Sequence, residues 1–423
     1  MTQIKFFLAL VFLTQSVLFS QSGWVQQYSG TYSRLMDTYF INEMSGFASG
    51  EKGVLLKTTT GGSFWNNVFN RNEYDVLSIY FISDIGWAVV KDNIEEDSFY
   101  VFKTINSGIS WNRYSLDSIK FFYTIANIEF VNHTTGYITA GGGFFKSTNG
   151  GLTWFKPTDL IFGVGSYFID SMTGWACNTP TKIYKTFNGG YNWIILNLYT
   201  YHQYSADFHF VNSQTGFCLS NRYNGTFYKT TNGGTDWVFN TSLDYYYASF
   251  DFVDNNTGYI IGMEHFSNYT DNFFKTTNCG LNWTKNILNI KQKFYNLNFS
   301  SVNTGWIVGD SGTIIKTTSG GVTIGIQQIG TNIPVDFSLS QNYPNPFNPS
   351  TKIKFDISGT SVAQTFLSVY DIMGREVEIL VNEMLKPGKY EVDWNAANYT
   401  SGVYYYKITS GDFTETRKMV LVK

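Results

Sequence analysis

The stretch Lys229-Thr230-Thr231-Asn232-Gly233-Gly234-Thr235-Asp236-Trp237 decides the fold, because close copies of it recur along most of the chain. Its lysine recurs as Lys57, Lys103, Lys146, Lys185, Lys229, Lys275 and Lys316. Tryptophan follows eight residues after each of the first six lysines, and Ile324 stands at the seventh position. Successive lysines are 39 to 46 residues apart, which is the period of a four-stranded propeller blade. The repeat therefore predicts seven blades.

The other half of each repeat is a strand that ends in Phe, then a polar turn, then glycine with an aromatic residue. Phe252 with Gly258-Tyr259 is one example. Apolar and polar residues alternate in both halves, which indicates strands. The Asn-Gly-Gly element favours a hairpin turn, in which Thr and Asn side chains bond the turn's own amides and Trp packs back across it. The predicted fold class is all-β.

The composition excludes several classes of protein. Aromatic residues make up 18% of the chain and charged residues 14%, so neither a disordered chain nor a coiled coil fits. The formal net charge is -3. Because no basic field is available to neutralise a phosphate backbone, we expect no nucleic-acid partner.

The amino terminus carries two signals. Residues 1–22 contain Lys5 followed by an apolar run, which is typical of a signal peptide, and the mature chain contains no predicted transmembrane span. Residues 23–27 then look like a fourth strand detached from its blade. We expect this strand to pair near residues 314–317 and close the ring, with Trp24 in the place that Ile324 leaves vacant.

The sequence changes character after the last blade. The predicted propeller covers residues 23–324, and a proline-rich linker covers 325–350. Residues 351–423 then alternate strand and turn patterns, which predicts a small antiparallel β-sandwich.

Two family resemblances follow from these motifs. The Thr-x-Asn-x-Gly-x-x-Trp element resembles the Asp-box or BNR repeat, and in its Lys-Thr-Thr-Asn-Gly-Gly form it is similar to the photosystem II stability and assembly factor family of seven-bladed propellers. Asp-box propellers also include sialidases, xyloglucan hydrolases and sorting receptors, so the resemblance implies an architecture rather than an activity.

The second resemblance concerns the carboxy terminus. Residues 339–349, 369–377, 401–405 and 418–423 closely resemble the motifs of the type A carboxy-terminal sorting domain of the type IX secretion system. This resemblance implies a Gram-negative host of the Bacteroidetes or Chlorobi group. It also implies that residues 339–423 engage the secretion machinery and that the protein is secreted or displayed on the outer-membrane surface.

Catalytic motifs are absent from the sequence. The four histidines are scattered without metal-ligand spacing, and neither a Gly-x-Ser-x-Gly motif nor a phosphate-binding loop occurs. We therefore expect no cofactor, no metal and no catalytic residue. A glycoside hydrolase is the alternative, with an acid and a base among Glu129, Asp207 and Asp251. An assembly-factor-like propeller that binds protein is a further alternative.

The remaining candidate is a site for an extracellular glycan or peptide. We expect it on the face of the blade-joining loops, which vary most between repeats and carry aromatic residues such as Tyr245, Tyr246 and Tyr247. Each predicted inner strand adds one residue directly before its conserved Phe, and these candidate ligand-binding residues are Tyr39, Tyr80, Glu129, Tyr167, His209, Asp251 and Asn298.

Overall fold

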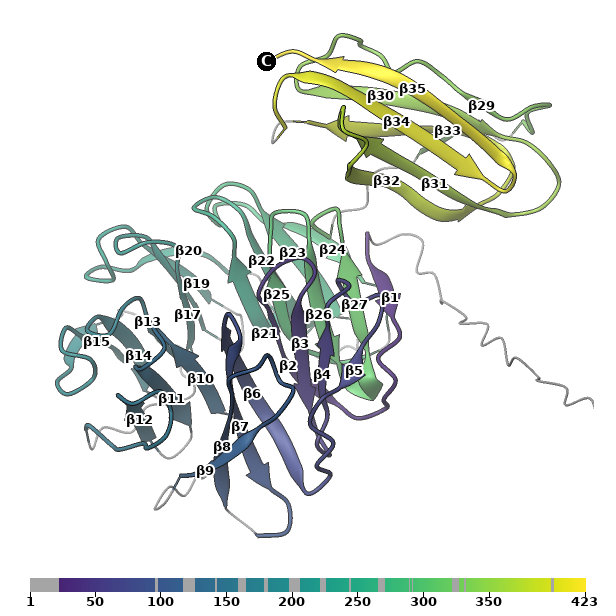
Figure 1. Cartoon of the computed structure of the whole chain (residues 1–423). Coiled ribbons are helices and arrows are strands. Elements are labelled where there is room, and N and C mark those ends of the chain that lie inside the picture. Colours follow the sequence, from purple (N-terminus) through teal and green to yellow (C-terminus); the bar gives the residue numbers. More distant parts are fainter. Residues whose placement is uncertain are drawn as a thin grey trace, which may run out of the picture.

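A computed structural model describes residues 23–95, 98–116, 126–140, 143–158, 165–178, 182–197, 206–220, 226–242, 245–264, 271–288, 290, 292–321, 327–330, 332–396 and 399–423. Within these ranges the fold is all-β, and the short 3-10 turn η1 (Asp310–Gly312) is the helical element. No helix in the described part is long and apolar enough to cross a membrane. Figure 1 shows a propeller and a separate sandwich, drawn in green and yellow.

The propeller has seven blades, and each is an antiparallel sheet whose strands follow one another from the channel outward. The first three blades comprise β2 (Leu35–Phe40), β3 (Gly46–Gly50), β4 (Leu55–Thr58) and β5 (Asn66–Asn67); β6 (Tyr74–Ile82), β7 (Ile85–Asp92), β8 (Phe99–Thr104) and β9 (Asn112–Ser115); and β10 (Ala126–Phe130), β11 (Gly136–Ala140) and β12 (Gly143–Ser147), where Phe155 adds a single bridge to Lys146.

Blades four to six repeat this order. They comprise β13 (Ser166–Phe168), β14 (Gly174–Asn178), β15 (Lys182–Thr186) and β16 (Ile194–Asn197); β17 (Ala206–Phe210), β18 (Gly216–Ser220), β19 (Thr226–Thr230) and β20 (Val238–Ser242); and β21 (Tyr245–Phe252), β22 (Gly258–Glu264), β23 (Asp271–Thr276) and β24 (Thr284–Ile287).

Blade seven joins the two ends of the propeller. It contains β25 (Phe294–Phe299), β26 (Gly305–Gly309) and β27 (Ile314–Thr317), and its outermost strand is β1 (Val25–Gln27), which pairs with β27. Trp24 is buried and meets the ring of Phe299 edge-on at 6.0 Å. Trp283 meets Phe252 of its own blade in the same way at 6.1 Å. The predicted ring closure is therefore confirmed for β1 and Trp24, whereas Ile324 lies outside the described residues.

Aromatic stacking joins every pair of neighbouring blades. The aromatic residue after each repeated glycine stacks on the terminal Phe of the next inner strand, with centroids 3.4 to 3.8 Å apart. The glycine itself is required, because a Cβ on Gly258 would lie 2.5 Å from the Phe252 ring. Burial of these flat faces explains why the repeat keeps Phe, Gly and an aromatic residue at fixed spacing.

The Asp-box turn is held by its own side chains, as predicted. In blade five the Thr230 hydroxyl accepts the amide of Gly234 at 2.8 Å, and Asn232 Oδ1 accepts the amide of Asp236 at 2.9 Å. Gly233 and Gly234 both have positive φ. These bonds replace strand pairing at the hairpin and explain the Thr, Asn and Gly of the motif.

The carboxy-terminal module is the predicted sandwich of two antiparallel sheets. One sheet has the order β28-β33-β30-β29 and the other β32-β31-β34-β35. Two of its strands, β28 and β29, come from the range 325–350 for which a linker is predicted. The strands are β28 (Gln327–Gly330), β29 (Ser338–Leu339), β30 (Ser350–Ile357), β31 (Ala363–Tyr370), β32 (Glu376–Leu385), β33 (Gly388–Asn395), β34 (Gly402–Ser410) and β35 (Phe413–Leu421).

Candidate ligand site in the propeller channel

One residue on the innermost strand of every blade is partly exposed, while the Phe that follows it is buried between blades. This alternation is the period of two expected of a strand that borders a channel. The seven residues are those predicted from the sequence: Tyr39 on β2, Tyr80 on β6, Glu129 on β10, Tyr167 on β13, His209 on β17, Asp251 on β21 and Asn298 on β25. We call them the channel ring.

Several members of the channel ring also bond the next blade. Glu129 accepts the amide of Phe168 at 3.1 Å, and Asp251 accepts the amide of Phe299 at 2.9 Å. Asn298 closes the circle by accepting the amide of Phe40 at 2.8 Å. Tyr167 bonds in the opposite sense, since its hydroxyl donates to the carbonyl of Phe210 at 2.9 Å. These hydrogen bonds join neighbouring blades, so the channel-ring residues have a structural role whether or not they also contact a ligand.

The carboxyl groups around the channel hold protons more tightly than they do in water. Burial raises the pKa of Glu129 to about 8, although bonds from Phe168 and Ser166 oppose the shift. The surrounding protein also removes hydration from Asp37 and raises its pKa to about 6, whereas Asp207 on β17 is exposed. The inside of the ring therefore favours neutral carboxyl groups at mildly acidic pH.

His209 and Asp251 form the one ion-pair contact of the channel ring among the described residues. Their Nδ1 and Oδ1 atoms lie 3.5 Å apart, and the side chains are 23% and 14% exposed. Burial lowers the pKa of His209, although the nearby Asp251 carboxylate opposes the shift. Burial also raises the pKa of Asp251. Both pKa shifts favour the neutral forms, so the contact between His209 and Asp251 is chiefly one between two uncharged polar groups. The centroid of the His209 ring also lies 5.7 Å from that of Tyr167.

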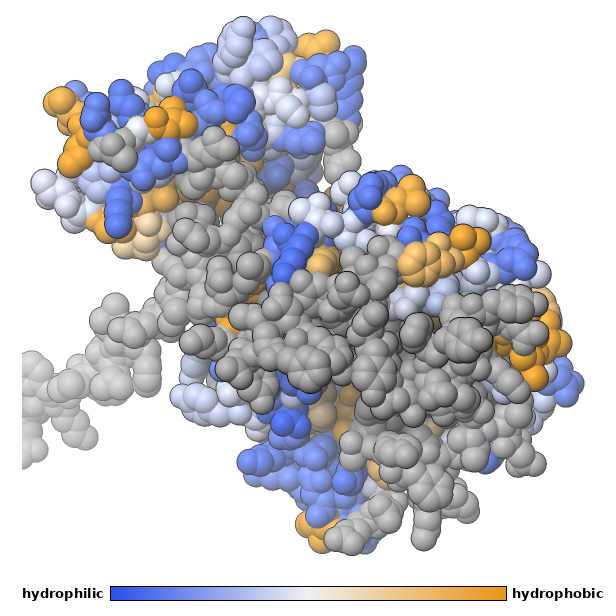
Figure 2. All heavy atoms as spheres, turned by 180° about the vertical axis from the view of Figure 1, so that it is seen from behind, coloured by the Kyte–Doolittle hydropathy of each residue, from blue (hydrophilic) through white to orange (hydrophobic). Residues whose placement is uncertain are grey.

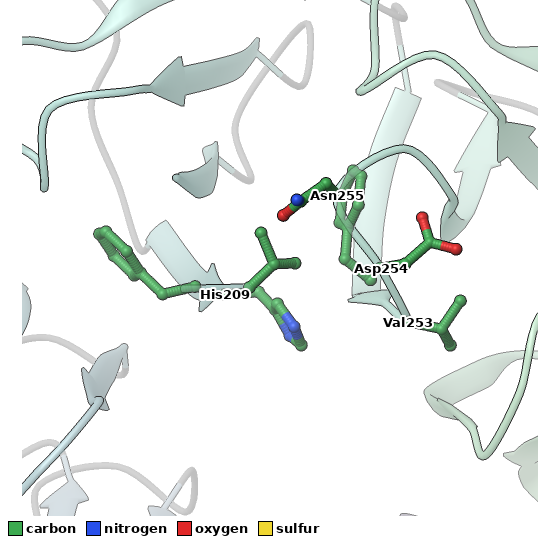
Figure 3. A pocket seen from close by; sticks show the side chains of 7 residues that line it. His209, Val253, Asp254 and Asn255 are labelled. Atoms are coloured by element: carbon green, nitrogen blue, oxygen red, sulfur yellow. The ribbon is translucent and has the colours of Figure 1, made fainter. Parts of the chain in front are cut away.

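A pocket of about 440 Å³ opens beside this pair, between blades five and six. It is lined by His209, Phe210, Val211, Phe252, Val253, Asp254 and Asn255. Figure 3 shows the imidazole of His209 on one side, with Asp254 and Asn255 across from it. More of the accessible lining is polar than apolar, because Phe210 and Phe252 are buried between blades, so the pocket offers mainly polar groups to a ligand.

The pocket opens on the face of the Asp-box turns. Val253, Asp254 and Asn255 follow the end of β21, and the Asp-box of the same blade lies beside that hairpin, since the amide of Cys279 donates to the carbonyl of Asn256 at 2.9 Å. The sequence pointed instead to the opposite face, where the variable loops lie. Two further blade-joining loops that carry aromatic residues, 121–123 and 199–204, lie outside the described part of the chain.

Tyr245, Tyr246 and Tyr247 are not loop residues. They form the start of β21, where Tyr245 pairs with Glu264 and Tyr247 with Gly262. The Tyr247 side chain is buried and meets Phe274 edge-on at 6.2 Å. The expected exposed loop at this position is wrong for Tyr247, because β21 is longer than the inner strands of most other blades and carries this residue into a buried contact with Phe274 on β23 of the same blade.

The repeated lysines have a role that the sequence did not reveal. Lys57 Nζ donates to the carbonyl of Ser107 at 2.7 Å, and Lys146 Nζ donates to that of Gly189 at 2.9 Å. Each lysine also lies over the aromatic residue of its own blade, at 5.1 to 5.8 Å. The repeated lysines therefore connect one blade to the Asp-box turn of the next. In the sequence, the recurrence of lysine at the same position of every repeat was the one signal of this structural role.

We searched the described ranges for a metal site. They contain no group of three or more His, Cys, Asp and Glu side chains arranged to hold an ion. The carboxylates of Glu129 and Asp251, two of the residues considered as a hydrolytic acid and base, both accept a main-chain amide of the following blade.

Comparison with known families follows the division into two modules. The model of the photosynthesis system II assembly factor YCF48 family matches residues 17–167. The model of the secretion system C-terminal sorting domain matches residues 341–423. Both predicted resemblances are confirmed. The carboxy-terminal match supports export by the type IX secretion system to the cell surface or beyond. A search of curated proteins finds no match.

Solved structures agree on the propeller fold. A structure titled "YCF48 bound to D1 peptide" is 18% identical, with a TM-score of 0.56, and covers 70% of this chain and 97% of its own. YCF48 from Cyanidioschyzon merolae is 15% identical, with a TM-score of 0.56 and coverage of 70% and 98%. The GH74 enzyme of Niastella koreensis is 13% identical, with a TM-score of 0.58 and coverage of 93% and 67%. At these identities the likeness concerns the fold alone.

Proposed function

We propose that this protein is an exported binding propeller that holds an extended peptide or a glycan at the channel mouth between blades five and six. Residues 1–22 act as a signal peptide, residues 23–324 bind the ligand, and the carboxy-terminal module from residue 339 onward directs passage through the type IX secretion system. The observation that carries the proposal is the pocket of about 440 Å³ beside the channel ring. It offers polar groups that can bond and orient a ligand, beside a smaller apolar surface.

A peptide ligand has additional support. The YCF48 propeller, which shares this fold, has been solved with a bound D1 peptide. The polar groups at the pocket, His209, Asp254 and Asn255, combine donors and acceptors that suit peptide amides as well as sugar hydroxyls. The same reasoning keeps open an assembly-factor-like role, in which the ligand is a segment of another protein.

A glycoside hydrolase is the second candidate, because the GH74 enzyme shares the fold. Hydrolysis needs two carboxyl groups that flank the scissile bond. Glu129 and Asp251 already bond main-chain amides of the next blade, which favours structural work over proton transfer. Release of reducing sugar from polysaccharides by the purified chain would establish the hydrolase instead.

Binding is tested by screening the exported chain on peptide and glycan arrays, followed by calorimetry on any hit. We expect Asp254→Ala to weaken binding at least about tenfold. Asp170→Ala is the matched control, because Asp170 bonds the amides of Met172 and Thr173 as Asp254 bonds those of Asn256 and Thr257. An equal loss of ligand affinity in both variants would mean that binding depends on the geometry of these turns and not on the pocket. An unchanged affinity in Asp254→Ala would refute the site.

A further inference from the structure

The outermost strands of the blades differ in chemistry at equivalent positions. The two residues after each Asp-box tryptophan begin the outer strand, and in blades one, two and six they are polar or charged: Asn66-Asn67, Asn112-Arg113 and Thr284-Lys285. In blades four and five both positions are apolar, as Ile194-Ile195 and Val238-Phe239. We call these four residues the apolar edge.

The apolar edge reaches solvent on both sides of its strands. Ile194 and Ile195 are each 50% exposed, and Val238 and Phe239 are 67% and 58% exposed. Successive residues of a strand point to opposite faces, so apolar surface lies on both faces of β16 and of β20. Figure 2 shows orange apolar patches among blue and white spheres on the part of this face that is not grey.

The same strands end their sheets. Both β16 and β20 are last in the strand order of their blades, so among the described strands none pairs with their outer side. Soluble proteins usually protect such an edge with charge, as Arg113 and Lys285 do in blades two and six. Neither β16 nor β20 contains a charged residue. Blades four and five therefore lack a protection that neighbouring copies of the same repeat retain.

These observations restrict what can cover the apolar edge. The partner must offer strand hydrogen bonds to the backbone, apolar contacts to both faces and no charge. Among the described strands, the apolar edge of a second copy meets all three conditions, since β16 and β20 are exposed, uncharged and last in their sheets. An antiparallel pairing of two identical edges is also self-complementary about a twofold axis. We propose that a second copy of this chain binds here, edge to edge, so that the exported protein is a dimer joined through blades four and five.

Sedimentation velocity of the full exported chain, over a range of protein concentrations, tests the proposal. We expect a reversible dimer whose dissociation constant changes little with ionic strength, because the joined surfaces carry no charge. Ile195→Arg and Phe239→Lys introduce the kind of residue that blades two and six carry at this position. Each should raise the dissociation constant at least about tenfold, because a charge at the contact loses its hydration.

Two controls separate the proposal from general effects. Ile109→Arg places a charge on a still more exposed apolar residue at the Asp-box tip of blade two and should leave the dimer intact. Ile195→Gln keeps a neutral side chain, so a weakened dimer in this variant with an unchanged melting temperature excludes misfolding as the cause. A chain that stays monomeric at its highest soluble concentration overturns the proposal and leaves the edge to a strand of another protein. An unchanged dissociation constant in both charge variants overturns it as well.

Discussion

The propeller and the sandwich bury their apolar side chains in two different ways. In the described residues of the propeller these side chains form seven clusters, whereas those of the sandwich form a single cluster that includes Val392, Trp394 and Tyr406. A close aromatic pair stacks across every junction between blades, with ring centroids 3.4 to 3.8 Å apart, so the ring depends on each junction and on its closure. The sandwich depends instead on a few central residues that touch both sheets. The two modules should therefore respond differently to comparable damage.

Opening the ring should have the largest effect. Deletion of residues 23–30 removes β1 and Trp24 and uncovers the edge of β27. Loss of a buried tryptophan alone costs about 3–5 kcal/mol, so we expect the propeller transition in calorimetry to fall by about 10 °C or more. The sandwich transition should stay in place. Tyr28→Ala is the control, because Tyr28 is exposed. Unchanged melting of the deletion variant would refute closure by this strand.

Damage to the sandwich core should have the converse effect. Trp394 is buried, and its Nε1 donates to Glu378 Oε2 at 2.7 Å. Trp394→Ala should destabilise the sandwich by about 3–5 kcal/mol while the propeller transition is unchanged. Ile372→Ala at an exposed turn should change neither transition. A simultaneous shift of both transitions would show that the modules unfold as one unit, contrary to the comparison.

A single overpacked junction should have an intermediate effect. In Gly258→Ala the new Cβ meets the Phe252 ring at 2.5 Å, so Phe252 and its stacking contact with Phe217 of blade five must shift. We expect a loss of about 1–3 kcal/mol from the propeller in chemical denaturation. Gly402→Ala in the sandwich provides the control, since the nearest atom to its Cβ is the Thr400 carbonyl oxygen at 4.0 Å. Equal losses in the two variants would argue against a tight glycine position in the blades.

The smallest expected effect is a difference in how the stabilities of the two modules depend on pH: the propeller should lose stability as pH rises, and the sandwich as pH falls. The folded pKa of Glu129 is about 8, above its ordinary value of 4.5, so the native propeller holds more protons than the unfolded chain between these values. Its stability should fall as pH rises through this range. Glu129→Gln should remove at least about 1 kcal/mol of that fall, as measured by denaturation at pH 5 and pH 8.5. A variant that keeps the whole slope would exclude Glu129 as its source.

The sandwich should change in the other direction. Bonds from Arg375 lower the pKa of Asp371, and bonds from Lys352 and Lys354 lower that of Glu391. Stability from such groups is present above their ordinary pKa and is lost as pH falls through the folded value. Because the partners Arg375 and Lys352 are largely exposed to solvent, the effect should be slight, and denaturation of the Glu391→Gln variant below pH 5 provides its measurement.

The sequence predicted the parts of the fold that depend on local chemistry. The Asp-box needs Thr, Asn and positive-φ glycine for its turn, and the Phe and glycine pair needs one spacing for its contact, so both can be recognised wherever they occur. Trp24 could be assigned to the last blade because the seventh repeat has Ile324 where the other six have tryptophan. Contacts between blades were not predictable in the same way, since the bond from the Phe168 amide to Glu129 joins residues of different repeats.

The candidate site divides along the same line. Period-two alternation placed Tyr39, Glu129 and Asn298 on inner strands, and the structure puts each of them there. It could not indicate that Asn298 bonds Phe40 across the point of closure. Nor could it show that the pocket lies beside Asp254, in a turn that the sequence marked as merely repetitive.

By itself, then, the sequence determined seven blades, their closure by the amino-terminal strand and an attached sandwich of the sorting-domain kind, because short repeated motifs specify their own turns and strand ends. Only the tertiary structure decided where neighbouring blades leave a pocket and which blade edges stay apolar. The pocket depends on residues that belong to different repeats. The apolar edges become apparent only when the equivalent position is compared between all the blades. They arise when closure brings the blades together, so no single repeat contains them.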